Sequence, residues 1–340
     1  YVRPLSAKHG FIVPINHDEG LNVDKNRLYE VLLQFSKLYT VDKKQLLYHF
    51  NLQVATDLSL LVSMKEYRKL ELPNKTSTYS WYYNRLPEIT QLNCLIPISK
   101  LYEDCENNFK AVLKHIKAAE PYPSGFDFYN KIATNVFFLI EQSGVGVERD
   151  DFIELFKPRN EIYSIEENVA LTYYNLYNIT SRPSNAFNSI NFAAIPKESA
   201  FREAFKPQND YFVELDFDGY HVRLLCDEIG YELTEESAHM QLAKLYFKKP
   251  DKHKNLKIFK LIQQYVDKMW ETYTKEGKVL APISEKPFTD RLQDMNPQKL
   301  MNYVMQSMET SRNVLILKEL LRYLQTKQSK ISLYVYDAII

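Results

Sequence analysis

The chain has 340 residues, its 43 lysines and arginines balance 43 aspartates and glutamates, and 45% of its residues are hydrophobic. That length allows about two domains, and the composition is that of a folded globular protein rather than a disordered or fibrous one. With zero net charge, any surface for nucleic acid must be local. No apolar run approaches the roughly 18 residues that a membrane span needs, so we predict no membrane partner.

Cysteine and glycine usage excludes several further classes of site. The three cysteines Cys94, Cys105 and Cys226 are widely spaced and form no CxxC pair, which argues against a zinc site and a disulfide framework and favours a reducing compartment. The 8 glycines form neither a GxGxxG nor a GxxxxGK[ST] motif. A dinucleotide-binding or P-loop enzyme is therefore not predicted.

A domain boundary is predicted near residue 125. Residues 1–125 mix short apolar runs with helical patterns, and the break Pro121-Tyr122-Pro123-Ser124-Gly125 ends this part. We therefore predict an N-terminal domain over 1–125 and a second domain over 126–340. The sequence begins at Tyr1 without a methionine and stops at Ile340 inside an apolar run, so we expect it to be part of a longer protein.

Helices, loops and strands follow in a definite order. Apolar residues at helical spacing predict helices from Phe109 and from Ile132, the second ended by Gly144, and residues 157–210 are typical of loops with short strands. Beyond them we predict, in order, a strand over 212–217, a helix over 221–228, a helix over 258–273, a helix over 298–325 with Asn296 as N-cap, and a hairpin over 332–340.

Two aspartates stand out in this pattern. Asp216 lies where a strand becomes a helix, and Asp337 lies near the tip of the predicted hairpin between two apolar segments. A carboxylate in such a place is costly unless it is paired or binds a ligand, although turn formation or helix capping explains many of them. Two acids from different strands can also hold two divalent ions about 3.5 to 4 Å apart for phosphoryl transfer.

The residues around these acids resemble the motifs of family A DNA polymerases. Residues 216–223, DFDGYHVR, are similar to the first palm motif DYSQIELR. Upstream, TSRPSN (180–185), NFAAIP (191–196) and FREAF (201–205) resemble TGRLSS, PNxQNIP and IRxxF in the same order. Downstream, AHMQLA (238–243), NYVMQS (302–307) and VYDA (335–338) resemble DxHxxxA, NxPIQG and VHDE. The resemblance covers about residues 130–340.

The resemblance implies an α+β fold, a polymerase palm whose antiparallel sheet is backed by helices. It implies an enzyme, a DNA-directed DNA polymerase that adds deoxynucleotides to a primer 3′ end and releases pyrophosphate. Asp216, Asp337 and the main-chain carbonyl of Phe217 match the ligands of two Mg²⁺ ions. The implied partners are primer-template DNA and deoxynucleoside triphosphates, with accessory replication proteins, and the implied location is the cytoplasm, that of an infected bacterium for a phage-encoded enzyme.

Three further positions match DNA-contacting residues of the family. Arg182 and Arg202 match arginines near the primer-template backbone, where a guanidinium pairs with phosphate. Gln306 matches a glutamine at the minor groove near the primer end, where readout is nearly independent of sequence. Solvated surface side chains are the plainer interpretation of all three.

The chain also departs from the family. His221 replaces the glutamate that helps to exclude ribonucleotides, and Tyr336 and Ala338 replace the histidine and glutamate of VHDE, so the nucleotide and sugar region formed by His221 and Tyr336 is altered. No fingers helix of the form RxxxKxxxFxxxYG is found, and the thumb is short. We therefore expect segments to be missing between about Phe247 and Leu256, and between Arg149 and Thr180.

The N-terminal part is similar to another domain of the same family. Residues 41–47 and 55–61 resemble the NxKxD and DTxLL segments of the 3′-5′ exonuclease domain, but its opening DxE segment is not found. We therefore expect a smaller exonuclease-like α/β domain, truncated or inactive. Two alternatives for the whole chain stay open, a polymerase-like protein that binds DNA without copying it and a metal-dependent nuclease.

Overall fold

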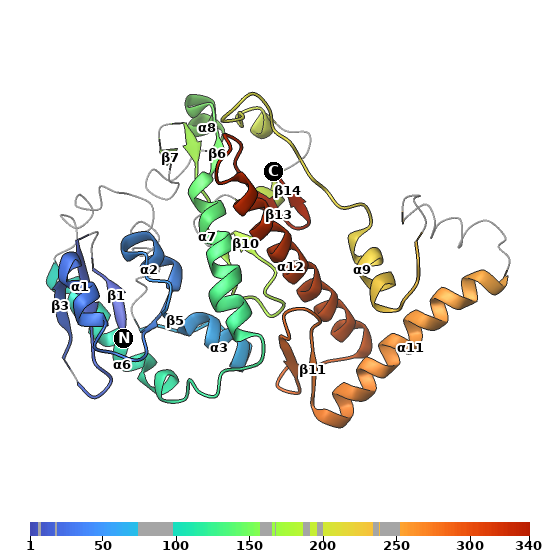
Figure 1. The fold of residues 1–340 in the computed structure, drawn as a ribbon, viewed down its shortest axis with the longest axis horizontal. Helices are drawn as coiled ribbons and strands as arrows, with labels where there is room; N and C mark the ends of the chain where they lie inside the picture. Colours follow the sequence, from blue (N-terminus) through green and yellow to red (C-terminus); the bar gives the residue numbers. More distant parts are fainter. Residues whose placement is uncertain are drawn as a thin grey trace.

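Short strands and long helices alternate along the chain in a mixed α+β fold (Figure 1). The computed structural model describes residues 1–5, 8–17, 19–73, 98–156, 165–166, 168–185, 191–195, 200–233, 238 and 252–340. The N-terminal elements lie at one end of the molecule, and the C-terminal helix α12 (Pro297–Leu324) crosses its middle between α7 and α11 (Figure 1).

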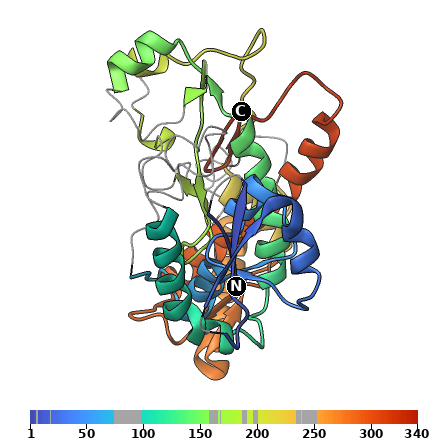
Figure 2. The same cartoon turned by 90° about the vertical axis from the view of Figure 1, so that its left-hand side faces the viewer.

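The N-terminal elements build a small sheet flanked by helices, seen from their own side in Figure 2. Strands β1 (Val2–Pro4), β2 (His9–Ile12) and β3 (Leu21–Asp24) pair antiparallel. The short strands β4 (Tyr39–Thr40) and β5 (Thr56–Asp57) pair in parallel. Aspartates cap the helices, because Asp24, Asp42 and Asp57 accept hydrogen bonds at the starts of α1 (Lys25–Leu32), α2 (Lys43–Phe50) and α3 (Leu58–Glu66).

The middle of the chain is a pair of helices followed by short strands. Helix α6 (Ile98–Lys117) is followed by a single π-helical turn, Phe128–Ala133, that continues into α7 (Thr134–Ser143). Gly144, with φ at 63°, ends α7 as the sequence predicts. Short elements follow: β6 (Val145–Gly146), α8 (Arg149–Phe156), β7 (Ile165–Glu166), β8 (Val169–Ala170), β9 (Tyr174–Asn175), β10 (Ser184–Asn185) and two 3₁₀ turns, Phe192–Ala194 and Ala200–Arg202.

The predicted C-terminal helices and hairpin are confirmed. They appear as α9 (Tyr220–Glu228), α11 (Lys252–Glu276), α12, and the hairpin of β13 (Tyr334–Val335) with β14 (Ala338–Ile339). A second hairpin, β11 (Lys278–Leu280) with β12 (Pro287–Thr289), joins α11 to α12. The Asn296 side chain accepts a hydrogen bond from the Lys299 amide, and Pro297 occupies the first turn.

The predicted strand over 212–217 is wrong in its extent. Only Leu215 pairs with another strand, through an antiparallel bridge to Ile339. Residues 211–216 are exposed, and Tyr211 is 84% exposed. Alternating apolar residues favour an extended backbone, but a strand also needs a partner, and no ladder forms beside 211–214 within the described residues.

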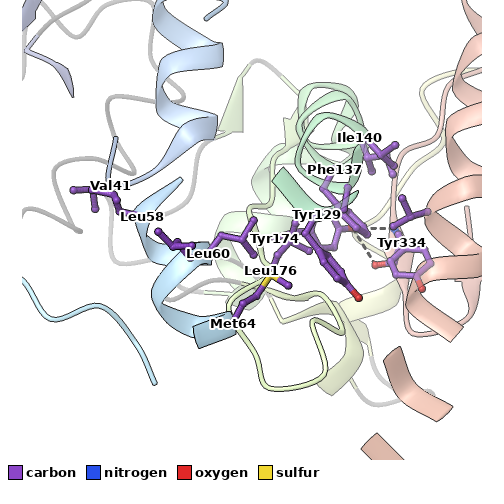
Figure 3. Packing of buried hydrophobic residues seen from close by; sticks show 14 of the residues in the cluster. Val41, Leu58, Leu60, Met64, Tyr129, Phe137, Ile140, Tyr174, Leu176 and Tyr334 are labelled. Atoms are coloured by element: carbon purple, nitrogen blue, oxygen red, sulfur yellow. Dashed lines mark hydrogen bonds between the residues drawn. The ribbon is translucent and has the colours of Figure 1, made fainter. Parts of the chain in front are cut away.

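One cluster of buried hydrophobic side chains extends from Tyr1 to Ile339 and so includes residues on both sides of position 125. Figure 3 shows part of it, from Val41 and Leu58 to Tyr334. The Tyr174 hydroxyl donates to the Tyr334 carbonyl at 3.0 Å and accepts from the Tyr334 amide at 2.8 Å, which ties β9 to β13 (Figure 3). The domain boundary near residue 125 stays a prediction.

Two fully buried lysines join α2 to the middle of the chain. The Lys43 amine donates to the Asn130 carbonyl at 2.6 Å. The Lys44 amine forms an ion pair with Glu141 of α7 at 2.5 Å and also donates to the Tyr174 carbonyl. Buried charges are tolerated only with such partners, so these contacts fix α2 against α7. The segments that resemble exonuclease motifs therefore supply helix caps and packing contacts.

The described helices include none with the length and apolar character of a membrane span. Cys105 and Cys226 are buried free thiols, and Cys94 lies outside the described residues. Of the first expected missing segment, residues 247–251 also lie outside the described residues, and Lys252 to Leu256 belong to α11. Of the second, Arg149 to Phe156 form α8, and residues 157–164 and 167 lie outside the described residues.

The buried Lys43 amine predicts a pH-dependent stability. Burial lowers its pKa to about 8, whereas an unfolded lysine titrates near about 10.4. Between these values the unfolded chain holds more protons, so the wild-type fold gains stability as the pH rises. Lys43→Met loses this gain, and the stability advantage of the wild type over the variant should grow by about 2 to 3 kcal/mol between pH 7 and pH 10.

Urea unfolding at both pH values measures this difference. Lys110→Met, at an exposed position of α6, is the control and should show a difference that does not change with pH. A constant difference for Lys43→Met as well would contradict the burial argument.

Candidate functional site

One pair of backbone hydrogen bonds brings Asp216 and Asp337 together. The Leu215 amide donates to the Ile339 carbonyl at 2.8 Å, and the Ile339 amide donates to the Leu215 carbonyl at 2.9 Å. Carried one residue further, this antiparallel register sets Asp216 opposite Ala338, beside Asp337. Asp337 lies in the turn between β13 and β14, which Tyr336 enters with φ at 58°. Asp216 is exposed and Asp337 is half-buried.

The turn after Asp216 leads directly into α9. Gly219 precedes the helix with φ at 60°, a conformation that a side chain would strain. The rings of Phe217 and Tyr220 stack at 4.5 Å between centroids. The Tyr220 hydroxyl donates to Asn313 of α12 at 2.8 Å, which fixes the first turn of α9 against α12. His221, in the same turn, is thereby held beside α12.

A buried carboxylate on α12 is the centre of the site. Glu309 has a side chain that is 2% exposed. It forms an ion pair with the Arg182 guanidinium at 3.0 Å, and the other carboxylate oxygen accepts a hydrogen bond from Nε2 of His221. Arg182 also lies over the ring of Tyr336, with its central carbon 4.5 Å from the ring centroid. Sequence positions 182, 221, 309 and 336 thus meet in one cluster.

Gln306 lies on the same face of α12, three residues before Glu309. It is half-buried, and its amide nitrogen donates to the Asn302 side chain at 3.3 Å. Arg202 is different, because it is exposed on the 3₁₀ turn Ala200–Arg202, which packs against α8. No described contact joins Arg202 to the cluster around Glu309. The structure therefore brings together Asp216, Asp337, Arg182, His221 and Tyr336, and leaves Arg202 apart.

Negative charges crowd around Asp337. Its carboxyl pKa is raised, chiefly by burial and further by the carboxylates of Glu309 and Asp216, while its own backbone amide and Arg182 act in the opposite direction. A divalent cation would relieve this repulsion, and oxygen ligands suit Mg²⁺. The described residues contain no group of three or more His, Cys, Asp or Glu side chains gathered as a metal site, so the fit to Mg²⁺ depends on two carboxylates.

Sequence reasoning missed Glu309 and Asn313. Both are polar or charged residues that are buried in a long helix. They follow Gln306 by three and seven residues, and this spacing, which places all three on one face of a helix, was the available signal. Sequence reasoning also found no helix of the fingers form. In the structure α11 runs from Lys252 to Glu276, so Lys257, Leu261 and Tyr265 lie on one helix at steps of four residues. That spacing equals the K-x-x-x-F-x-x-x-Y part of the fingers form.

The architecture is similar to that of a solved polymerase. The POL domain of Pol1 from M. smegmatis, in complex with a DNA primer-template and dNTP, matches with a TM-score of 0.59 over 99% of this chain and 87% of that chain, at 11% sequence identity. The chain has a polymerase-like fold. The prediction of a mixed α+β polymerase fold is thereby confirmed, and an exonuclease-like N-terminal domain is not.

Among the comparisons with known proteins, the likeness to a polymerase comes from the structure. No protein-family model matches the sequence, and no curated protein matches it either. At 11% identity the likeness extends to the fold and not to individual residues. The roles of Asp216, Asp337 and the residues around them remain predictions.

The Glu309 carboxylate lies where its charge raises the pKa of the Asp337 carboxyl, and substitution tests this. Glu309→Gln keeps the shape and removes the charge, so the pKa of the Asp337 carboxyl should fall towards its ordinary value. The loss of the ion pair between Glu309 and Arg182 should also lower the free energy of unfolding by about 3 kcal/mol. Carboxyl NMR titration and urea unfolding measure the two effects.

Glu319→Gln, on the exposed face of the same helix, is the matched control and should change neither quantity. An unchanged pKa of Asp337 in Glu309→Gln would show that Glu309 does not contribute to raising it.

Proposed function

We propose that the chain is a template-directed DNA polymerase, a nucleotidyltransferase that extends a primer 3′ end with deoxynucleotides. The observation that carries the proposal is the pairing of Leu215 with Ile339, which sets Asp216 beside Asp337 within a polymerase-like fold. These are the two acids that the ordered motif resemblance singles out. The match to a polymerase domain bound to primer-template and dNTP supports the same assignment.

Asp216, Asp337 and the carbonyl of Phe217 would hold two Mg²⁺ ions. When bound, the ions lower the pKa of the primer hydroxyl and neutralise the phosphates of the nucleotide. The side chains of the chain then have binding and orienting roles. Arg182 and Arg202 pair with backbone phosphates, and Gln306 donates to the minor groove at the primer end.

The sugar region of this chain is built differently from that of the family. The position of the family's glutamate holds His221, and a carboxylate reaches the same place from α12 through Glu309. The pair occupies a corner between α9 and the β13–β14 hairpin, with Tyr336 beside it. A bulky, paired side chain in this corner would restrict the sugar of the incoming nucleotide.

Helix α11 would take the part of the missing fingers helix. Lys257 is exposed near its first turns, and Tyr265 is half-buried eight residues later on the same face. An ammonium group at this position suits the triphosphate of an incoming nucleotide. This assignment removes the main argument for a protein that binds DNA without copying it. The upstream segments TSRPSN and NFAAIP, which resemble polymerase motifs in the same order, argue against the nuclease alternative.

Primer extension tests the function directly. A short DNA hairpin with Mg²⁺ and nucleotides should be lengthened, whereas a DNA-binding protein leaves it unchanged and a nuclease shortens it. Asp216→Asn and Asp337→Asn should each reduce extension to less than about one hundredth of the wild-type rate with little change in DNA affinity, because the acids hold metal ions and other side chains hold the DNA.

Asp127→Asn is the control, since this carboxylate is exposed and pairs with Lys131 far from the site in the sequence. It should extend the hairpin at the wild-type rate. Extension by either Asp216→Asn or Asp337→Asn above that hundredth would exclude the two-metal assignment.

Lys257→Ala tests the role of α11. The KM for nucleotide should rise about tenfold while primer-template affinity changes little, because the ammonium would contact the triphosphate and not the duplex. Lys275→Ala, exposed near the end of the same helix, is the matched control and should leave the KM unchanged. Equal KM values for the two variants would remove Lys257 from the nucleotide site.

A further inference from the structure

Lys286 is a buried amine that the proposed chemistry does not use. It directly precedes β12 and is fully buried. Its amine donates to the Asn178 carbonyl at 3.2 Å and to the Ser181 hydroxyl, and it lies 5.4 Å from the centroid of the Tyr129 ring. No ion pair of Lys286 occurs within the described residues, and burial lowers its pKa to about 7.

These contacts all converge on one tight turn. The Ser181 amide donates to the Asn178 carbonyl at 2.9 Å, so this carbonyl accepts from both the turn and Lys286. The Asn178 side chain donates to the Arg182 carbonyl at 2.8 Å and to the Ser184 hydroxyl at 3.1 Å. Ser181 itself has φ at 56°, a left-handed conformation that is unfavourable for serine without support.

The turn ends at Arg182, the residue that reaches Glu309 and Tyr336. A left-handed residue immediately before Arg182 fixes the direction in which its side chain leaves the backbone. The Lys286 amine donates hydrogen bonds to the hydroxyl of this left-handed residue, Ser181, and to the carbonyl of Asn178 at the other side of the turn. An amine without a counter-ion in the interior is costly, so packing alone is a poor explanation for a lysine here.

We propose that Lys286 is a positioning residue, which braces the turn from Asn178 to Arg182 and thereby aims the Arg182 guanidinium at the primer-template. The part of this inference that concerns DNA rests on the proposed function, and the part that concerns the direction of Arg182 does not. The brace comes from the β11–β12 hairpin, more than 100 residues beyond the turn in sequence.

Lys286→Met tests the brace, because methionine fills the same space without donating hydrogen bonds. Primer-template affinity, followed by fluorescence anisotropy, should fall about tenfold, since a small displacement of a positioned group is costly. In an Arg182→Ala background, Lys286→Met should cause almost no further loss of primer-template affinity, because both substitutions remove the same contact with DNA. Wild-type affinity in Lys286→Met, or full additivity with Arg182→Ala, would overturn the inference.

A second readout needs no DNA. Arg182 lies on the Tyr336 ring, so the NMR signals of its side chain should carry a ring-current shift. That shift should be lost in Lys286→Met. Signals that stay at their wild-type positions would overturn the inference even if the protein does not bind primer-template, whereas lost shifts together with a wild-type protein that fails to bind DNA would contradict only the proposed function.

Two further variants separate positioning from folding. Lys43→Met removes another fully buried amine, which donates to the Asn130 carbonyl. Although this substitution affects stability, the DNA affinity should stay within about twofold of wild type, and the Arg182 signals should keep their wild-type positions. Ser181→Gly keeps the left-handed backbone and removes the hydroxyl that Lys286 contacts. It should reproduce the loss seen in Lys286→Met, and wild-type behaviour would overturn the inference.

Discussion

The need to satisfy polar groups buried along α12 governs the arrangement of the molecule. One face of α12 is buried, and the polar side chains on that face need partners from other elements. Ser307 and Ser311 meet the Tyr129 hydroxyl, and Asn313 meets the hydroxyls of Tyr220 and Tyr334. Glu309 meets Arg182 and His221. These partners belong to the middle of the chain, to α9 and to the β13–β14 hairpin, so α12 determines where these elements lie.

The same requirement shapes the site. Glu309 forms an ion pair with Arg182 and a hydrogen bond with His221, whereas no ion pair of Asp216 or Asp337 occurs among the described residues. The negative charges of Glu309 and Asp216 both raise the pKa of the Asp337 carboxyl, and under the proposed function Asp216 and Asp337 are the acids that would bind Mg²⁺. Tyr336 adds a ring on which Arg182 rests, so the arginine is fixed from two sides.

The N-terminal part is held to this centre by buried charges rather than by a linker. Lys44 pairs with Glu141 of α7, and Lys43 caps the Asn130 carbonyl, so α2 and α7 share one polar interior. Asp57 lies in the same interior, where burial and the nearby Asp42 raise its carboxyl pKa to about 7. Such groups are stabilising only when all their partners are in place, which makes the junction between the two parts sensitive to any single substitution.

The sequence by itself determined the local features. Asn296 predicted the start of α12, Gly144 predicted the end of α7, and the ordered motifs around Asp216 and Asp337 resemble those of a polymerase. These features depend on backbone preferences and side-chain spacing within a few residues, which a single sequence displays.

Only the tertiary structure decided which distant residues meet. The strand expected over 212–217 was reduced to one bridge at Leu215, because pairing depends on a neighbour that periodicity does not reveal. The contacts of Glu309 with Arg182 and of Lys286 with Ser181 join residues that are more than 100 positions apart in the sequence. The burial of a polar group is a property of the assembled interior, so its partners follow from packing and not from the local pattern.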